Sequence, residues 1–260
     1  MIKALFFDVD GTLVSFKTHR IPQSAVDALT EAKRRGIGIY ISTGRPRRLI
    51  NNLDEIGHLI DGYITATGAY CTVGGDVIRC LTIPDDEARA FVRKSDEMRF
   101  ATLVVGVRDL TVINPNTDVD RLYRKMLNVS DLGEDIPVER VLRQGVIQFT
   151  PIIDTDTERQ LMPMMKHCVS ARWYPDFADI TARGADKGTA LKAMAARIGV
   201  DVSETMAFGD GGNDKPIIGA AGVGVAMGNA TDDVKAAADY VTSSVDDDGV
   251  ASALRHFRVI

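Results

Sequence analysis

Residues 3–14 read KALFFDVDGTLV, and this stretch decides the fold prediction. The apolar run IKALFF predicts a buried β-strand, which ends abruptly at Asp8 and Asp10. Asp and Gly are turn formers, so DVDGT could simply end a strand and begin a loop. In an extended strand, however, side chains two positions apart point to the same side. We therefore expect the two carboxylates to lie close together.

This carboxylate pair needs a neutralising group. At roughly 4 Å and an effective dielectric constant near 20, two such charges repel by about 4 kcal/mol. A divalent cation would relieve the repulsion, and carboxylate oxygens suit a hard cation such as Mg²⁺. The pair is therefore more consistent with a functional site than with a plain turn.

The segments that follow alternate between strand and helix patterns. Helices are predicted at residues 22–36 and 46–57, and apolar strands at 37–42 and 61–67. Such alternation is typical of right-handed βαβ units around a parallel sheet.

The pattern changes in the middle of the chain. A hairpin is expected to turn at Gly74-Gly75, and residues 81–179 mix strands and helices without βα alternation. The alternation resumes with a helix that Asp186 opens. The sequence thus predicts an α/β fold, in which a Rossmann-like parallel-sheet core of residues 1–80 and 180–260 carries an inserted α+β domain.

Composition excludes several classes of partner. The 260 residues carry a net charge of -5 with no basic stripe, so no nucleic acid is expected. We expect no secretory leader and no membrane span, and hence a cytoplasmic protein. Three cysteines do not suggest a disulfide framework. A monomer or a small homo-oligomer is expected.

Polar motifs recur where predicted strands end or helices begin. In open α/β sheets, ligands bind beyond the carboxyl ends of the strands, so these motifs are expected to converge. Thr43 could merely cap a helix, and GDGGND could be only a turn. Lys187 at a helix start opposes the helix dipole, which hints that it serves an anion. The side chains of the four motifs are Asp8 and Asp10; Thr43 and Arg45; Lys187; and Asp210, Asn213 and Asp214.

In their order along the chain, DVDGT, STGR, DKG and GDGGND resemble the four motifs of the haloacid dehalogenase-like (HAD) superfamily of phosphohydrolases. The insertion between the second and third motifs resembles the cap of Cof-like, type IIB sugar phosphatases. The resemblance covers essentially the whole chain, and its motifs are highly specific as a set.

The resemblance implies a mechanism. Asp8 would attack phosphorus to form an aspartyl-phosphate, and Asp10 would protonate the leaving group and then activate water. Mg²⁺ would be held by Asp8, by the backbone carbonyl of Asp10 and by Asp210. Asp214 would orient metal-bound water, either as a direct ligand or through that water.

The resemblance also implies the groups that bind substrate. Thr43 and Lys187 would grip the phosphoryl oxygens, and Asn213 would hold Lys187 or the acidic cluster. Arg45 could reach the substrate or pair with an acid. Trp173, in the insert, could stack on a sugar or belong to the core of the insert.

The loop after the third strand departs from the family pattern. Many Cof-like members carry Asn-Gly-Ala there, whereas this chain has TGA at residues 67–69. Contacts of this loop, including Gly68, with substrate are therefore expected to differ from those of relatives.

The expected substrate is a small phosphorylated metabolite, with hexose phosphates first and pentose phosphates, phosphorylated cofactors and flavin precursors as alternatives. Two other functions fit parts of the pattern. One is a phosphomannomutase-like phosphomutase. The other is a receiver-like phospho-acceptor module, which would place its acceptor on a later strand and would carry no large insert.

Overall fold

The computed structural model describes the backbone of residues 1–260 and every side chain except that of Trp173, so the prediction for that side chain lies outside the described residues. The chain forms two compact units. Unit 1 comprises Met1–Arg79 and Asp186–Ile260, and unit 2 comprises Cys80–Ala185. Unit 2 extends beyond residue 179 because its strand β10 (Phe177–Ala182) continues past that point.

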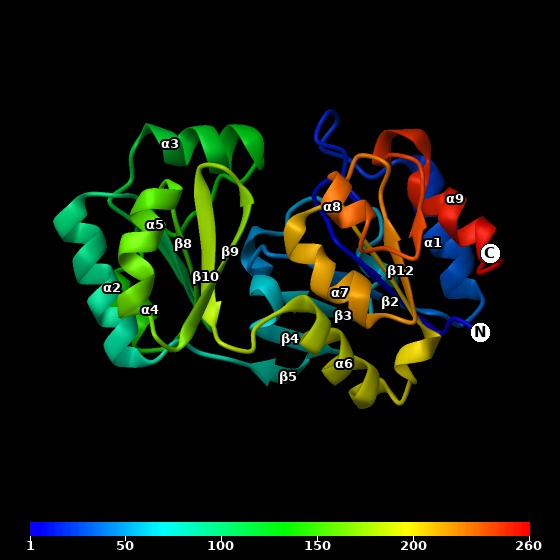
Figure 1. Cartoon of the computed structure of the whole chain (residues 1–260), viewed down its shortest axis with the longest axis horizontal. Coiled ribbons are helices and arrows are strands. Elements are labelled where there is room, and N and C mark those ends of the chain that lie inside the picture. The colour runs from blue at the N-terminus through cyan, green and yellow to red at the C-terminus, as the bar shows by residue number, and fades with distance from the viewer. The chain divides into compact units, whose positions relative to one another are not determined.

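Unit 1 contains an eight-stranded sheet (Figure 1). The strands from β13 to β3 run parallel, and β4 is antiparallel to β3. This arrangement confirms the predicted α/β fold with a mainly parallel sheet. In spatial order the strands are β13 (Tyr240–Val241), β12 (Val223–Ala226), β11 (Thr205–Gly209), β1 (Ala4–Phe7), β2 (Gly38–Ser42), β3 (Gly62–Thr65), β4 (Tyr70–Val73) and β5 (Asp76–Cys80).

Helices cover both faces of this sheet. Along β1, Leu5 and Phe7 pack on the face that α1 and α9 cover, and Ala4 and Phe6 pack on the face of α6 and α7. Strand β1 is therefore buried on both sides, which explains its unbroken apolar run. The helices of unit 1 are α1 (Gln23–Arg34), α6 (Lys187–Ile198), α7 (Lys215–Ala220), α8 (Asp232–Lys235) and α9 (Gly249–His256).

The prediction of a helix at residues 46–57 is wrong. Only two short 3₁₀ turns form there, Arg47–Leu49 and Gly57–Leu59. The Arg45 guanidinium donates to the Leu49 carbonyl at 3.0 Å, which occupies an acceptor that a continuing α-helix would need. A local contact between a side chain and the backbone four residues later thus overrides the apolar periodicity of this segment.

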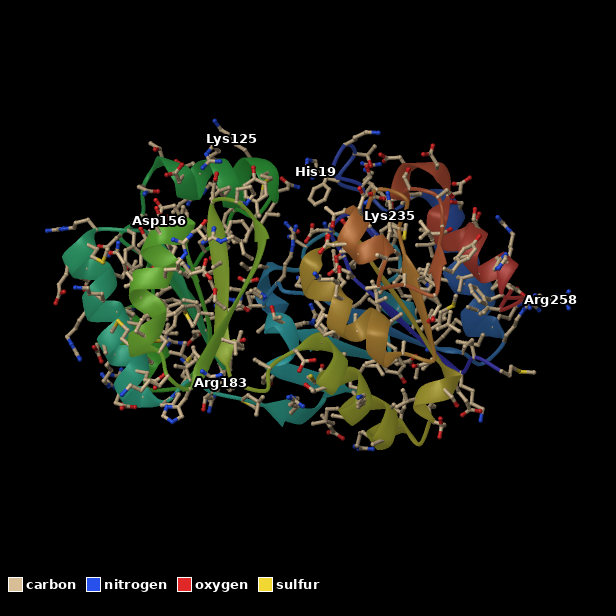
Figure 2. The ribbon with its side chains drawn as sticks, viewed as in Figure 1. His19, Lys125, Asp156, Arg183, Lys235 and Arg258 are labelled. Atoms are coloured by element: carbon tan, nitrogen blue, oxygen red, sulfur yellow. The ribbon has the colours of Figure 1, made fainter. Side chains whose placement is uncertain are left out.

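Unit 2 contains an antiparallel sheet in the order β7-β6-β8-β10-β9 (Figure 1). Its core includes Phe91 and Phe149, whose ring centroids lie 4.6 Å apart. Lys125 and Asp156 are exposed on its helical segments and point outward (Figure 2). Its other strands are β6 (Thr102–Gly106), β7 (Leu110–Ile113), β8 (Val146–Pro151) and β9 (Cys168–Tyr174). Its helices are α2 (Asp85–Met98), α3 (Thr117–Val119) with a π-helical continuation (Asp120–Met126), α4 (Val138–Leu142) and α5 (Thr155–Leu161).

Within the described residues, none of the helices combines the length and the apolar character that a membrane crossing requires.

Replacing Phe149 by Ala tests the core of unit 2. Phe149 is fully buried, so the cavity left by its ring should lower the free energy of unfolding by about 3–5 kcal/mol. Urea unfolding followed by circular dichroism measures the loss. Phe16→Ala is the matched control, because Phe16 is 46% exposed and its removal opens no cavity. Equal effects of the two substitutions would contradict this account of the core.

Candidate active site

The four sequence motifs meet at one edge of the sheet of unit 1. Asp8 follows β1, Thr43 follows β2 and Asp210 follows β11. These strands are neighbours and run parallel, so the residues after their carboxyl ends are brought together. Lys187, the first residue of α6, reaches the same place.

Lys187 lies at the centre of this cluster. Its side chain is fully buried, and its ammonium group donates to Asp8 Oδ1 at 2.7 Å and to Asp214 Oδ1 at 2.5 Å. Burial opposes the charged form, but the charges of Asp214 and Asp8 outweigh it and raise the pKa of Lys187. The unfavourable place of this cation at a helix start is thus explained by two carboxylates.

Asp8, Asp210 and Asp214 form a carboxylate triad. One oxygen of each lies within 4.8 Å of the others. Burial, followed by the charge of Asp214, raises the pKa of Asp8 well above its usual value. The same two causes raise the pKa of Asp210 to about 7. The donor set contains only hard oxygen ligands, which fits a divalent cation of the Mg²⁺ type.

Two residues hold Asp210 in place. The Thr12 hydroxyl donates to Asp210 Oδ1 at 2.8 Å. Gly11 lies so close that a Cβ there would stand 2.3 Å from Asp210 Oδ2, and its φ is +84°. Glycine is therefore required at this position both for space and for backbone conformation.

Asp214 is held from both sides. Its Oδ1 accepts from Lys187, and its Oδ2 accepts the backbone N–H groups of Asp210 and Gly211 at 3.1 and 2.9 Å. The carboxylate therefore orders the GDGGND loop as well as balancing the buried cation.

Asp10 takes a different partner from Asp8. Strand β1 ends at Phe7, so strand geometry does not extend to this pair, and burial and the charge of Asp214 raise the pKa of Asp8 more than the charge of Asp10 does. Arg45, itself only 6% exposed, donates from Nε and Nη2 to the two Asp10 oxygens at 2.7 and 2.6 Å. Of the two alternatives for Arg45, the structure shows pairing with an acid.

The remaining predicted residues surround this cluster. Thr43 is buried, and its Oγ1 accepts the Arg45 backbone N–H at 3.1 Å, so its own hydrogen is left to donate. Gly68 has φ +92° and packs against the Asp186 backbone. Among the described side chains, no hydrogen bond joins Asn213 to Lys187.

Sequence reasoning missed the positioning residues Thr12 and Asn229. The Asn229 side chain donates to the Gly11 carbonyl at 2.8 Å and accepts the Val245 N–H at 2.9 Å. Its signal in the sequence is its place just after the apolar strand β12, at the same edge of the sheet.

Comparison with known families agrees with this geometry. A family model described as haloacid dehalogenase-like hydrolase matches residues 5–254.

This chain belongs to the haloacid dehalogenase-like hydrolases.

Known members of this family resemble the chain along its full length. Phosphatase YwpJ of Bacillus subtilis is 30% identical over an alignment that is 294 residues long with its gaps. The alignment covers 98% of this chain and 99% of YwpJ. The structure of the HAD subclass IIB sugar phosphatase BT4131 is 45% identical with a TM-score of 0.93, covering 99% of this chain and 100% of that one. The phosphatase BT1666 from Bacteroides thetaiotaomicron is 39% identical with a TM-score of 0.86, covering 100% and 96%.

These similarities confirm the predicted family, including its Cof-like, type IIB branch. The chain is a HAD-type phosphatase, that is, a phosphoric monoester hydrolase. The buried aspartate triad is consistent with the divalent metal site of such enzymes.

The raised pKa of Asp210 predicts how the metal-free protein responds to pH. Its pKa of about 7 exceeds the ordinary value of 3.8, so protonated Asp210 stabilises the fold. This stabilisation is complete below pH 3.8 and is lost as pH rises through about 7. In EDTA, the melting temperature of Asp210→Asn should therefore rise relative to wild type between about pH 5 and about pH 8.

Calorimetry at several pH values measures this difference. Adding Mg²⁺ should raise the melting temperature of the wild type more than that of Asp210→Asn. The ion offsets the repulsion among the three carboxylates, and the variant lacks one of them. A difference in melting temperature between the two proteins that stays constant with pH would contradict the raised pKa of Asp210.

Proposed function

We propose that this HAD hydrolase is a Mg²⁺-dependent phosphatase of small phosphorylated metabolites, hexose phosphates first, acting through an aspartyl-phosphate on Asp8. The observation that carries the proposal is the buried Lys187 between Asp8 and Asp214, with Asp210 beside them. The carboxylates of this cluster provide a nucleophile, and the Lys187 ammonium provides a donor for an anionic phosphoryl group.

Asp8 is proposed as the nucleophile. Lys187 binds its Oδ1, which leaves Oδ2 to form a bond to phosphorus as the bond from phosphorus to the leaving oxygen breaks. Attack requires the ionised carboxylate. Burial favours the protonated form of Asp8, whereas the Lys187 ammonium favours the charged form.

Asp10 is proposed to move the protons. It would give a proton to the leaving oxygen, and then take one from the water whose oxygen attacks phosphorus and releases Asp8. Arg45 donates to both Asp10 oxygens and so holds this carboxyl group in place. To act as an acid, protonated Asp10 must turn one oxygen away from this fork.

Thr43 and Lys187 are proposed to bind the phosphoryl oxygens, with Asn213 supporting the acidic cluster. Donors fixed in advance stabilise the charge that develops on the transferring group without reorganisation during the reaction. Thr43 is fixed through Arg45, and Lys187 through its two carboxylates.

The oxygen donors present fit a divalent ion. Asp8, Asp210 and the Asp10 backbone carbonyl would hold Mg²⁺, with Asp214 orienting its water or binding it directly. When bound, the ion would offset the repulsion between these carboxylates and a phosphate dianion.

The substrate class is inferred from relatives. BT4131, 45% identical, is named a sugar phosphatase. YcsE of Bacillus subtilis, 30% identical over 262 residues, is named a 5-amino-6-(5-phospho-D-ribitylamino)uracil phosphatase. We therefore place hexose phosphates first and phosphorylated ribityl compounds second, with unit 2 as the substrate-specificity domain.

Phosphate release from a panel of sugar phosphates, nucleotides and phosphorylated cofactors tests this proposal. Release should require Mg²⁺, stop in EDTA and be strongest on hexose phosphates. A malachite green assay measures it. Conversion of a sugar phosphate into its isomer without release of phosphate, in the presence of a sugar bisphosphate activator, would instead identify a phosphomutase.

Substitution of the two aspartates tests their roles. Asp8→Asn should abolish turnover, because an amide is a poor nucleophile toward phosphorus. Asp10→Asn should lower kcat by about 10²- to 10⁴-fold on alkyl phosphates. Its effect should be smaller on p-nitrophenyl phosphate, whose leaving group needs no proton. Steady-state kinetics measure both effects.

Asp156→Asn is the matched control, because this exposed aspartate on α5 lies in unit 2 and outside the triad (Figure 2). Substantial turnover by Asp8→Asn would refute the assignment of the nucleophile.

A further inference from the structure

The loop after β3 contains a buried hydroxyl without a partner. Thr67 is 6% exposed, and its Oγ1 makes no hydrogen bond to any described residue. Buried polar atoms in native proteins are nearly always paired, so this atom needs an explanation.

The backbone of the same loop is strained. Thr67 has φ 52° and ψ 32°, a left-handed conformation that β-branched residues rarely adopt. Its neighbours Ala66 and Gly68 also have positive φ, at 50° and 92°. Asn or Gly would suit this backbone better at position 67. The threonine at this position therefore carries a backbone cost that Asn or Gly would avoid.

The loop is packed against both segments that carry the proposed phosphate ligands. On one side, the Thr67 N–H donates to the Thr43 carbonyl at 3.3 Å. On the other side, a Cβ at Gly68 would stand 2.3 Å from the carbonyl oxygen of Asp186, the residue before Lys187. Thr67 therefore lies between the Thr43 loop and the start of α6.

We propose that the Thr67 hydroxyl donates a hydrogen bond to an oxygen of the phosphoryl group under transfer. This inference rests on the proposed phosphatase function. Phosphoryl oxygens are acceptors, and the Thr67 hydroxyl is a donor with no acceptor in the chain itself. The strained backbone then serves to hold the hydroxyl in place before substrate arrives.

Ser42 shows that a missing hydrogen-bond partner alone is not sufficient to identify a phosphate-binding hydroxyl. Its hydroxyl is also buried and unpartnered, yet it belongs to the regular strand β2. Only Thr67 combines an unpartnered hydroxyl, a left-handed backbone and contact with the Thr43 loop among the described residues.

Three substitutions of Thr67 test the proposal in the full-length, Mg²⁺-loaded protein. Thr67→Val removes the hydroxyl and keeps the shape, and should lower kcat/KM by roughly 10- to 100-fold. Thr67→Ser keeps the donor and should stay close to wild type. Thr67→Gly removes the hydroxyl and also the backbone strain, so it should fold well and lose activity as Thr67→Val does.

The loss should be the same for hexose 6-phosphate and for p-nitrophenyl phosphate, because the two share only the phosphoryl group. A loss confined to the sugar substrate would overturn the proposal and assign Thr67 to the leaving group. Unchanged kinetics in both Thr67→Val and Thr67→Gly would also overturn it. Thr242→Val is the matched control, because Thr242 is a buried threonine whose hydroxyl bonds to the Gly249 carbonyl.

Binding of inorganic phosphate gives a second readout. Calorimetry on the Mg²⁺-loaded proteins should show weaker phosphate binding for Thr67→Val and Thr67→Gly than for wild type and Thr67→Ser. Equal affinities would overturn the proposal. If wild type hydrolyses no phosphoester, the proposed function fails, while this titration still tests the role of Thr67 in binding phosphate.

Discussion

The buried Lys187 ammonium is the interaction on which the rest of unit 1 depends. Removing an ammonium group from water is costly, and the cost is offset only when opposite charges lie at hydrogen-bonding distance. Asp8 and Asp214 meet that requirement. Strand β1, helix α6 and the loop after β11 must therefore converge on one point, and loss of Lys187 would leave these buried carboxylates without their cation.

The charges of this cluster also explain its chemistry. Three carboxylates surround one ammonium, so the cluster lacks positive charge. The raised pKa values of Asp8 and Asp210 express the same shortage. A bound divalent cation would supply the missing positive charge and would reduce the repulsion between the carboxylates and an anionic substrate. The arrangement that is unfavourable without metal is thus the one suited to binding metal and phosphate together.

Much of this could be predicted from the sequence, because the signals are local. Strands buried on both faces are continuous apolar runs, and the motif residues follow directly after them. The partners could not be predicted in this way. Thr12 meets Asp210 across 198 positions, and Asn229 meets Gly11 across 218. The false helix at 46–57 has a different origin, because the Arg45 contact with Leu49 is local but is made by a polar side chain, which apolar periodicity does not register.

The interruption of unit 1 by unit 2 has a consequence for biosynthesis. Unit 2 is one continuous segment, whereas the halves of unit 1 are separated by it. Asp8 and Lys187 are 179 positions apart, so a ribosome releases the nucleophile long before its cation. Asp8 is without this cation until then, while unit 2 already has its complete sequence. Asp210 and Asp214 follow Lys187 along the chain, so vectorial synthesis provides all of unit 2 before the reactive centre has its last members.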